Sequence, residues 1–210
     1  MSMKEETVVV TGFGPFGEHK VNSSWECVKL LPTLNIEELG VKLVIKQIPV
    51  SYEYIDDNVP ALWKEHNPIL MVHVGVNGAA DGLLLEQKAH RTGYDGTDIH
   101  GKLPSPRQTD SSTPDIIGPL YDVSQLKDKV VESDVGVPVC VSCNAGRYLC
   151  EYTYYTSLNI SSLRTIFIHV PPLSKFSAKQ ISAALKTVIC SLVQHVHDHE
   201  SNQINAILDE

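Results

Sequence analysis

Two side chains in the second half of the chain could together carry out nucleophilic chemistry. Cys150 lies near the start of a predicted helix over residues 147–158, where the helix dipole would stabilise its thiolate. His169 closes an apolar run and precedes Pro171-Pro172, so the chain must turn there. The ordinary alternative is a buried cysteine and a hydrogen-bonded core histidine. If both side chains reach one cleft, they form a thiolate–imidazolium pair suited to acyl transfer.

A cysteine–histidine pair usually needs a third group that orients the imidazole. Asp81, Glu86 and Asp95 are the acidic candidates, and spacing along the chain does not choose among them. His73 lies among apolar residues in the middle of a predicted strand. It is most simply a hydrogen-bonded core residue, and it is also the main rival to His169 as a catalytic base.

A loop rich in glycine and phenylalanine, Thr11-Gly-Phe-Gly-Pro-Phe-Gly17, follows the first apolar run. Phe13 and Phe16 have two interpretations: both rings cap the core, or both line a flat apolar slot for a small ring. The loop also matches the G-x-G-x-x-G pattern of dinucleotide sites. That match is weak, because Pro15 removes a backbone donor and no acidic residue ends the second apolar run. A nucleotide-dependent enzyme is therefore a secondary hypothesis.

Two further groups of potential metal ligands are less specific. Cys140 and Cys143 are three residues apart on one predicted strand, so their side chains point to opposite faces and cannot share a zinc ion. We interpret both as packing residues. His195 and His199 would share a helix face, and His197 would not. A polar helix end explains all three histidines more simply than a metal site.

Apolar, β-branched runs alternate with helical patterns, which is typical of an α/β domain with a mainly parallel sheet. The runs are nearly continuous, as in strands covered on both faces, and they span residues 7–11, 41–48, 69–76, 137–141 and 165–170. Helical patterns span residues 24–31, 55–63, 147–158 and 181–196. Pro60 must kink or begin the second helix, and Ser177 with Gln180 resembles a capping box before the last.

The ends of the predicted strands carry the unusual residues, and ligands bind outside the carboxyl ends of strands in open α/β sheets. Four predicted strands are followed by such a loop, beginning at Gly12, Asn77, Ser142 and His169. We therefore expect four loops to converge on one cleft at one edge of the sheet. Residues 87–118, rich in Gly, Pro, Asp, Thr and Ser, are expected to form a long ordered insertion or a lid.

Composition narrows the class of protein. The chain has 210 residues, of which 42% are hydrophobic and 20% charged, as expected for one folded domain over residues 1–210. Its net charge of −8 argues against nucleic-acid or anionic-membrane surfaces, which need a basic footprint. No apolar run approaches the roughly 18 residues of a membrane span. With no export signal visible, we place the chain in the cytosol. Its five cysteines, an odd number, favour free thiols.

Five motifs, in this order and spacing, resemble those of the pyroglutamyl-peptidase I family (pyrrolidone-carboxylate peptidases), and most of all its animal cytosolic members. The resemblance runs from Val8 to about Leu192, through Thr11-Gly-Phe-Gly-Pro-Phe-Gly17, Asn22-Ser-Ser-Trp25, Val72-His-Val-Gly75 followed by Leu85-Glu86, Ala145-Gly-Arg-Tyr-Leu-Cys150 and Phe167-Ile-His-Val-Pro171. It implies a single three-layer α/β/α sandwich with a mixed, mainly parallel central sheet. It also implies a thiol protease, an omega-type exopeptidase that removes N-terminal pyroglutamate (5-oxoproline) from peptides through a thioester acyl-enzyme.

The same resemblance assigns roles to individual residues. Cys150 matches the family's nucleophile, His169 its base and Glu86 its orienting acid. The implied substrate-binding positions are Phe13 and Phe16, which line the pyroglutamyl pocket, Asn22 before the first helix, and Val76 and Asn77, whose main-chain groups would bind the lactam. The implied partners are peptides with N-terminal pyroglutamate, without nucleic acid, membrane, metal or cofactor. The alternative is a catalytically inactive relative that acts as a binding module, and the intact triad argues against it.

The chain departs from the family pattern at two positions beside these motifs. Ser23 stands where proline is common, and Glu151 stands where many members have asparagine. Glu151 places a negative charge beside Cys150, which would oppose formation of the thiolate. Both departures lie outside the triad, so they bear on rate and specificity more than on the chemistry.

Overall fold

Six strands form the central sheet: β1 (Glu6–Phe13), β2 (Val41–Ile48), β3 (Leu70–Val76), β4 (Leu83–Glu86), β7 (Val139–Ser142) and β8 (Thr165–Val170). The computed structural model describes residues 6–17, 20–105 and 113–208. The strand order is β2-β1-β3-β8-β4-β7. The first four of these run parallel, whereas β4 is antiparallel to β8, and β7 is parallel to β4. The sheet is therefore mixed and mostly parallel, as predicted.

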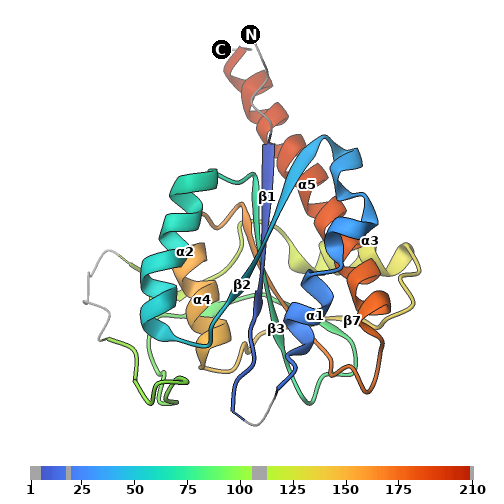
Figure 1. Cartoon of the computed structure of the whole chain (residues 1–210). Helices are drawn as coiled ribbons and strands as arrows, with labels where there is room; N and C mark the ends of the chain where they lie inside the picture. The colour runs from blue at the N-terminus through green and yellow to red at the C-terminus, as the bar shows by residue number, and fades with distance from the viewer. Residues whose placement is uncertain (1–5, 18–19, 106–112, 209–210) are drawn as a thin grey trace.

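Helices cover both faces of the sheet: α1 (Ser23–Val28), α2 (Tyr52–His66), α3 (Val123–Glu132), α4 (Leu149–Leu158) and α5 (Ala178–Leu208). α2 and α4 lie on one face, and α1, α3 and α5 lie on the other (Figure 1). Two short 3-10 helices, Leu31–Leu34 and Ile36–Leu39, lead into β2. A second, two-stranded antiparallel sheet is formed by β5 (Ala89–His90) and β6 (Ile116–Ile117). This arrangement confirms the three-layer α/β/α fold.

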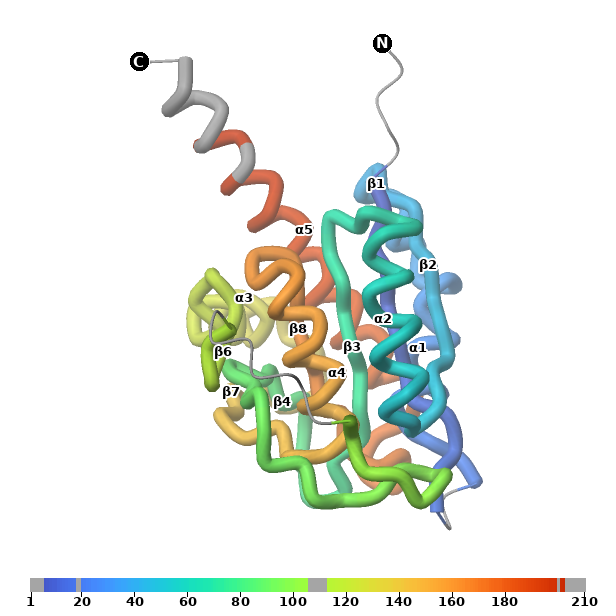
Figure 2. Tube along the Cα trace, turned by 90° about the vertical axis from the view of Figure 1, so that its left-hand side faces the viewer, coloured from blue at the N-terminus to red at the C-terminus, as the bar shows by residue number. Residues whose placement is uncertain are grey.

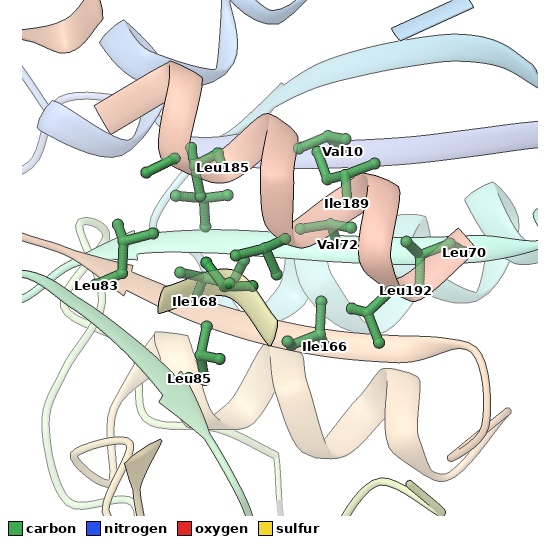
Figure 3. Packing of buried hydrophobic residues seen from close by; sticks show 14 of the residues in the cluster. Val10, Leu70, Val72, Leu83, Leu85, Ile166, Ile168, Leu185, Ile189 and Leu192 are labelled. Carbon is green, nitrogen blue, oxygen red and sulfur yellow. The ribbon is translucent and has the colours of Figure 1, made fainter. Parts of the chain in front are cut away.

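Each face of the sheet has its own hydrophobic core, because strand side chains alternate between the faces. Val72 and Ile168 face Leu185 and Ile189 of α5 (Figure 3), whereas Met71 packs on the α2/α4 side. Burying one such aliphatic side chain contributes about 1.5–3 kcal/mol. The same alternation turns every second residue near the ends of β3 and β8 toward α4, where the polar groups described below lie.

The predicted stripe on the C-terminal helix is confirmed. Its five members are all buried against the sheet: Ile181, Leu185, Val188, Leu192 and Val196. The capping box is also present, since Gln180 N donates to Ser177 Oγ (3.3 Å) and Ser177 N donates to Gln180 Oε1 (3.0 Å). Pro60 lies inside α2, which begins at Tyr52, so it does not start that helix.

Among the elements that pack on or within the central sheet, β4 and α3 were not predicted from the sequence. β4 is only four residues long and follows a turn, so it has no clear periodicity. α3 buries Val123, Leu126 and Val130, whose spacing of three and four residues is a helical signal that could have been used.

The prediction of four loops converging from one edge is wrong for the loop after β7. Because β4 runs antiparallel to β8, and β7 runs parallel to β4, the carboxyl end of β7 lies at the opposite edge from those of β1, β3 and β8. Residues 143–148 carry the chain back before α4 begins at Leu149. Cys150 therefore reaches the predicted cleft only because residues 143–148 lead the chain back to that edge of the sheet.

The described part of the predicted insertion, residues 87–105 and 113–118, is held by hydrogen bonds to its neighbours. Tyr52 OH donates to Gly96 O (2.9 Å), and Tyr148 OH donates to Thr97 O (2.8 Å). Burial acts to raise the pKa of Asp98, but backbone N–H donors from Lys102, His100 and Tyr52 outweigh it and lower the pKa. Figure 2 shows the segment before residue 106, in green, running past the lower end of α4 toward α2. In these ranges the insertion is ordered.

None of the helices in the described ranges is long and apolar enough to cross a membrane. The assignment of residues 1–210 to a single domain stays a prediction.

Candidate active site

Glu86 and His169 meet across two neighbouring strands. β4 pairs with β8 so that Leu84 is opposite His169, and Glu86 shares a face with Leu84. His169 Nδ1 donates a 2.7 Å hydrogen bond to Glu86 Oε1. Glu86 is fully buried, and His169 is 4% exposed. Glu86 Oε2 has no hydrogen-bond partner in the described part of the chain, so the imidazole is the donor to which this carboxylate is directed.

Cys150 completes this arrangement from the second position of α4. Its thiol is hydrogen-bonded to the His169 side chain. Cys150 is partly exposed, whereas Glu86 and His169 are buried, so the sulfur is the part of the group most open to a substrate. The structure therefore brings together the three residues that the resemblance assigned to the triad.

The electrostatics of the site favour a charged imidazole. Burial acts to lower the pKa of His169, but its interactions with the side chains of Cys150 and Glu86 outweigh burial and raise the pKa to about 9. Because this pKa lies above neutral pH, His169 is protonated there. An imidazolium beside a thiol is the arrangement that keeps the sulfur nucleophilic.

Gly75, on β3, makes room for the sulfur. A Cβ atom at this position would lie 2.7 Å from Cys150 Sγ and 2.8 Å from Phe167 Cζ. The Phe167 ring in turn lies 4.9 Å, centroid to centroid, from the imidazole of His169. This role of Gly75 could not be predicted from the sequence, because the close approach of a side chain from another element leaves no local signal.

His73 is a hydrogen-bonded core residue, as the sequence predicted, and its geometry excludes it as the catalytic base. It is fully buried, and both ring nitrogens are hydrogen-bonded, Nδ1 to Thr11 Oγ1 (2.7 Å) and Nε2 to Ser157 Oγ (2.6 Å). Burial lowers the pKa of His73 to about 3. It is neutral, and it has no free nitrogen to accept a proton.

The other acidic candidates lie elsewhere. Asp81 is exposed and forms an ion pair with Lys175 Nζ (2.6 Å). Asp95 is exposed on the segment before residue 106. Of the three carboxylates that spacing left open, Glu86 is the one that binds His169.

The interpretation of Cys140 and Cys143 as packing residues is wrong. Both are exposed, because β7 is an edge strand of the sheet and Cys143 lies just beyond it. His195 packs against Tyr121, and His197 Nε2 binds Glu6 Oε2 (2.6 Å). Within residues 6–17, 20–105 and 113–208, no group of three or more His, Cys, Asp or Glu is placed to hold a metal ion.

The two phenylalanines of the first loop have different environments. Phe13 is 2% exposed and packs in the core under α2 and α4. Phe16 is half-buried and lines a cavity of about 330 Å³. Asn22 holds this loop to α1: its Oδ1 accepts from Ser24 N (3.0 Å), and its Nδ2 donates to Gly14 O (2.9 Å). One ring therefore lies in the core, and the other lines the cavity.

The cavity beside Phe16 lies at the ends of β3 and β8. Its lining is mainly apolar and comprises Phe16, Val21, Ser23, Val76, Gly78, Pro172 and Leu173. Asn77 forms the turn after β3, donating its N–H to Val170 O (3.0 Å) and accepting from Ala80 N (3.1 Å). Val76 lies two residues past the last pairing of β3 with β1, which joins Gly12 to Val74.

The geometry gives no support to a dinucleotide site. Gly12 lies within β1 and packs on α1, where a Cβ would be 3.0 Å from Trp25 Cα. α1 begins only at Ser23, so the glycine loop does not open directly into a helix as that pattern requires.

Comparison with known proteins decides the family. A sequence profile of the pyroglutamyl peptidase family matches residues 6–197. The chain belongs to this family. Pyroglutamyl-peptidase 1 of Homo sapiens is 41% identical over 201 residues, which cover 95% of this chain and 96% of that protein. The resemblance drawn from the motifs, including its closeness to animal members, is thereby confirmed.

Solved structures of the family share the fold. Pyroglutamyl peptidase I from Bacillus amyloliquefaciens, at 26% identity, superposes with a TM-score of 0.76 over 92% of this chain and 97% of that chain. Pyrrolidone carboxyl peptidase from Thermococcus litoralis, at 20% identity, has the same fold, with a TM-score of 0.80 over 92% and 96% of the two chains. Membership of the pyroglutamyl peptidases confirms the predicted activity, that of a cysteine peptidase that removes N-terminal pyroglutamate.

Proposed function

We propose that Cys150, His169 and Glu86 are the catalytic residues with which this pyroglutamyl peptidase removes N-terminal pyroglutamate from peptides. The observation that carries the proposal is the continuous contact from thiol to imidazole to buried carboxylate. Cys150 is the nucleophile, and His169 is the proton carrier. Glu86 holds the imidazole in one orientation and stabilises its charge.

The reaction follows from these three positions. The thiolate of Cys150 attacks the carbonyl carbon that joins pyroglutamate to the next residue, and the carbonyl electron pair moves onto the oxygen. When the carbonyl re-forms, the C–N bond breaks and His169 gives its proton to the leaving amine. Water then attacks the thioester while His169 accepts its proton. Collapse of the intermediate breaks the C–S bond and releases pyroglutamic acid, which loses its own proton to solvent and becomes the carboxylate. The thiolate and the imidazolium are restored.

The start of α4 supports stabilisation of the developing oxyanion. Cys150 occupies the first turn, where backbone N–H groups have no acceptor within the helix, and Tyr148 at the N-cap supplies no side-chain acceptor. These N–H groups and the helix dipole would favour a negative oxygen beside the sulfur.

The pyroglutamyl ring is flat and uncharged, so its pocket needs apolar surface and partners for one N–H and one C=O. A lactam group left unsatisfied there would cost about 1–3 kcal/mol. Phe16 supplies an apolar face, with Phe13 behind it in the core. The backbone of Val76, beyond the last β1–β3 pairing, supplies the polar partners. Asn22 and Asn77 act by holding the two loops in place.

The substrates are pyroglutamyl peptides, and we propose no nucleic-acid or membrane partner, in keeping with the net charge of −8. A cytosolic location is supported by the five cysteines, all of which are free thiols.

Release of a fluorophore linked to pyroglutamate tests the assignment. Cys150→Ala should lower the turnover by about a thousandfold or more, since the nucleophile is lost. Cys143→Ala and Cys140→Ala are matched controls, because both thiols are exposed and outside the site. Iodoacetamide should inactivate the wild type, and EDTA should not. Turnover by Cys150→Ala would contradict the proposal, and a folded wild type without turnover would identify an inactive relative.

A further inference from the structure

Glu151 follows the nucleophile in sequence, and its carboxylate is fully buried. Oε2 accepts the backbone N–H of Arg147 (2.7 Å), and Oε1 accepts the backbone N–H of His90 (2.9 Å). Oε1 also binds Arg147 Nη1 (2.6 Å) and His90 Nδ1 (2.6 Å). A single carboxylate therefore joins the turn before Cys150 to strand β5.

The turn that Glu151 holds has an unusual backbone. Gly146 has φ = 97° and Arg147 has φ = 48°, so two consecutive residues are in the left-handed region. Arg147 is not a glycine, and this conformation is strained for it. The turn sets the direction in which α4 begins, and hence where the sulfur of Cys150 lies. The bond from Arg147 N–H to Glu151 ties that conformation to the helix itself.

His90, the other partner, belongs to the segment that supplies the triad carboxylate. It lies four residues after Glu86, and Glu86 binds His169. Glu151 thus connects the segment that carries the sulfur to the segment that carries the orienting acid.

The charge of Glu151 is matched within this cluster. Burial acts to raise its pKa, but hydrogen bonds from His90 and Arg147 outweigh burial and hold the pKa below its usual range. The carboxylate is therefore ionised, and the guanidinium of Arg147 lies against it. The negative charge that the sequence placed beside Cys150 is accompanied by a positive one, which offsets its repulsion of the thiolate.

We propose that Glu151 is a positioning residue for the nucleophile: it fixes the turn at Arg147 against His90 and so sets the distance from the Cys150 sulfur to the His169 imidazole. The inference rests on the proposed function, since it assigns a task relative to that triad. Glu151 is fully buried, so its carboxylate is not exposed to a substrate. A misplacement of about 1 Å in such a group can cost about a hundredfold in rate.

The test compares Glu151→Ala and Glu151→Gln with the wild type in fluorophore release and in the pH profile of Cys150 alkylation by iodoacetamide, followed by peptide mass. We expect kcat to fall about ten- to hundredfold with KM within about threefold, because the substrate pocket is built by other loops. We expect Glu151→Gln to lower kcat as well, because the side-chain N–H₂ of glutamine would face N–H donors of Arg147 or His90 and could not accept from them. Alkylation below neutral pH should slow, because the thiol lies less well against the imidazole.

Asp122→Ala is the matched control. Asp122 caps α3 through Ser124 N and Gln125 N, so this variant loses a helix cap far from Cys150. It should lose stability and keep the wild-type kcat and alkylation profile. Glu151 variants that behave the same way, with a lower melting temperature and unchanged kcat, would show a structural role only and overturn the proposal. Faster alkylation at low pH in Glu151→Gln would also overturn it, since that is the signature of lost repulsion alone.

His90→Ala provides a second arm if the Glu151 variants fail to fold. The side chain is half-buried, and its loss removes one of the two bonds that join Glu151 to β5, while the backbone N–H groups of His90 and Arg147 stay bound to the carboxylate. We expect a smaller fall in kcat, about three- to tenfold, again with KM little changed. An unchanged kcat in His90→Ala would contradict the proposal, whereas failure of the triad assignment itself would appear separately, as turnover by Cys150→Ala.

Discussion

His73 and His169 lie on neighbouring strands, on the same face of the sheet, and both are buried, yet they carry different charges. His73 is bonded to two hydroxyl groups, those of Thr11 and Ser157. His169 is bonded to a carboxylate and a thiol. Burial lowers the pKa of His73 to about 3, while the two acidic partners raise that of His169 to about 9. The charge of the partners, more than burial, decides which histidine can carry a proton.

Removing each imidazole ring in turn tests whether the two histidines have different roles. His169→Ala should lower kcat/KM by about a thousandfold or more, because the thiolate loses its counter-ion and the leaving amine loses its proton donor. His73→Ala should keep most of the activity and lose stability, by about 1–3 kcal/mol for each hydroxyl left without a partner. Fluorophore release and thermal unfolding measure both. The reverse pattern would reassign the base to His73.

A second test perturbs the sulfur without removing any polar group. Gly75→Ala adds a methyl group that would lie only 2.7 Å from Cys150 Sγ, so the thiol must move away from its position beside His169. We expect kcat to fall about ten- to hundredfold, since alignment in the pair is lost. The rate of Cys150 alkylation by iodoacetamide should fall with it.

Gly12→Ala serves as the control for crowding. A Cβ there would press on the α1 backbone, 3.0 Å from Trp25 Cα, on the other face of the sheet. It should lower the melting temperature without slowing alkylation of Cys150. Equal alkylation rates in Gly75→Ala and the wild type would show that the sulfur does not depend on the space at residue 75.

The same two histidines show how far the sequence could predict the site. An apolar strand that ends in a histidine before two prolines marks His169, and a histidine inside such a strand marks His73, so both roles could be predicted from pattern. Glu86 could not be chosen by pattern, because β4 is too short to show a period and its pairing with β8 is non-local. Glu86 was identified as the acid of the triad only through the resemblance to the pyroglutamyl-peptidase family.

The layers were predictable for the same local reasons, and the strand directions were not. Continuous apolar runs predict strands covered on both faces, and the stripe on α5 predicts a buried helix. Whether a strand runs up or down depends on the connection before it, and the unpredicted β4 reverses the direction of β7. The place of a strand in the sheet is equally non-local: β7 lies at the edge, and Cys140 on it is exposed.

The activity should depend on pH through the charge of His169. His169 has a folded-state pKa of about 9, above its ordinary value of 6.5, so it is protonated at neutral pH and loses its proton as the pH rises through about 9. Because departure of the amine needs that proton, kcat/KM for fluorophore release should fall over the same range. The stability that the charged ring contributes should likewise be complete below about pH 6.5 and lost toward pH 9.

Removing the sulfur of Cys150 should change the pKa of His169 and leave that of His73 unchanged. Cys150 contributes the largest of the interactions that raise the pKa of His169, so Cys150→Ala should lower that pKa, with Glu86 still holding the ring. His73 has no charged partner among its hydrogen bonds, and it should stay neutral from pH 5 to pH 10 in both proteins. Imidazole ¹⁵N NMR during a pH titration follows both rings at once. A His169 ring that titrates near pH 6.5 in the wild type would remove the charge difference between the two histidines and, with it, the reason for placing the proton on His169.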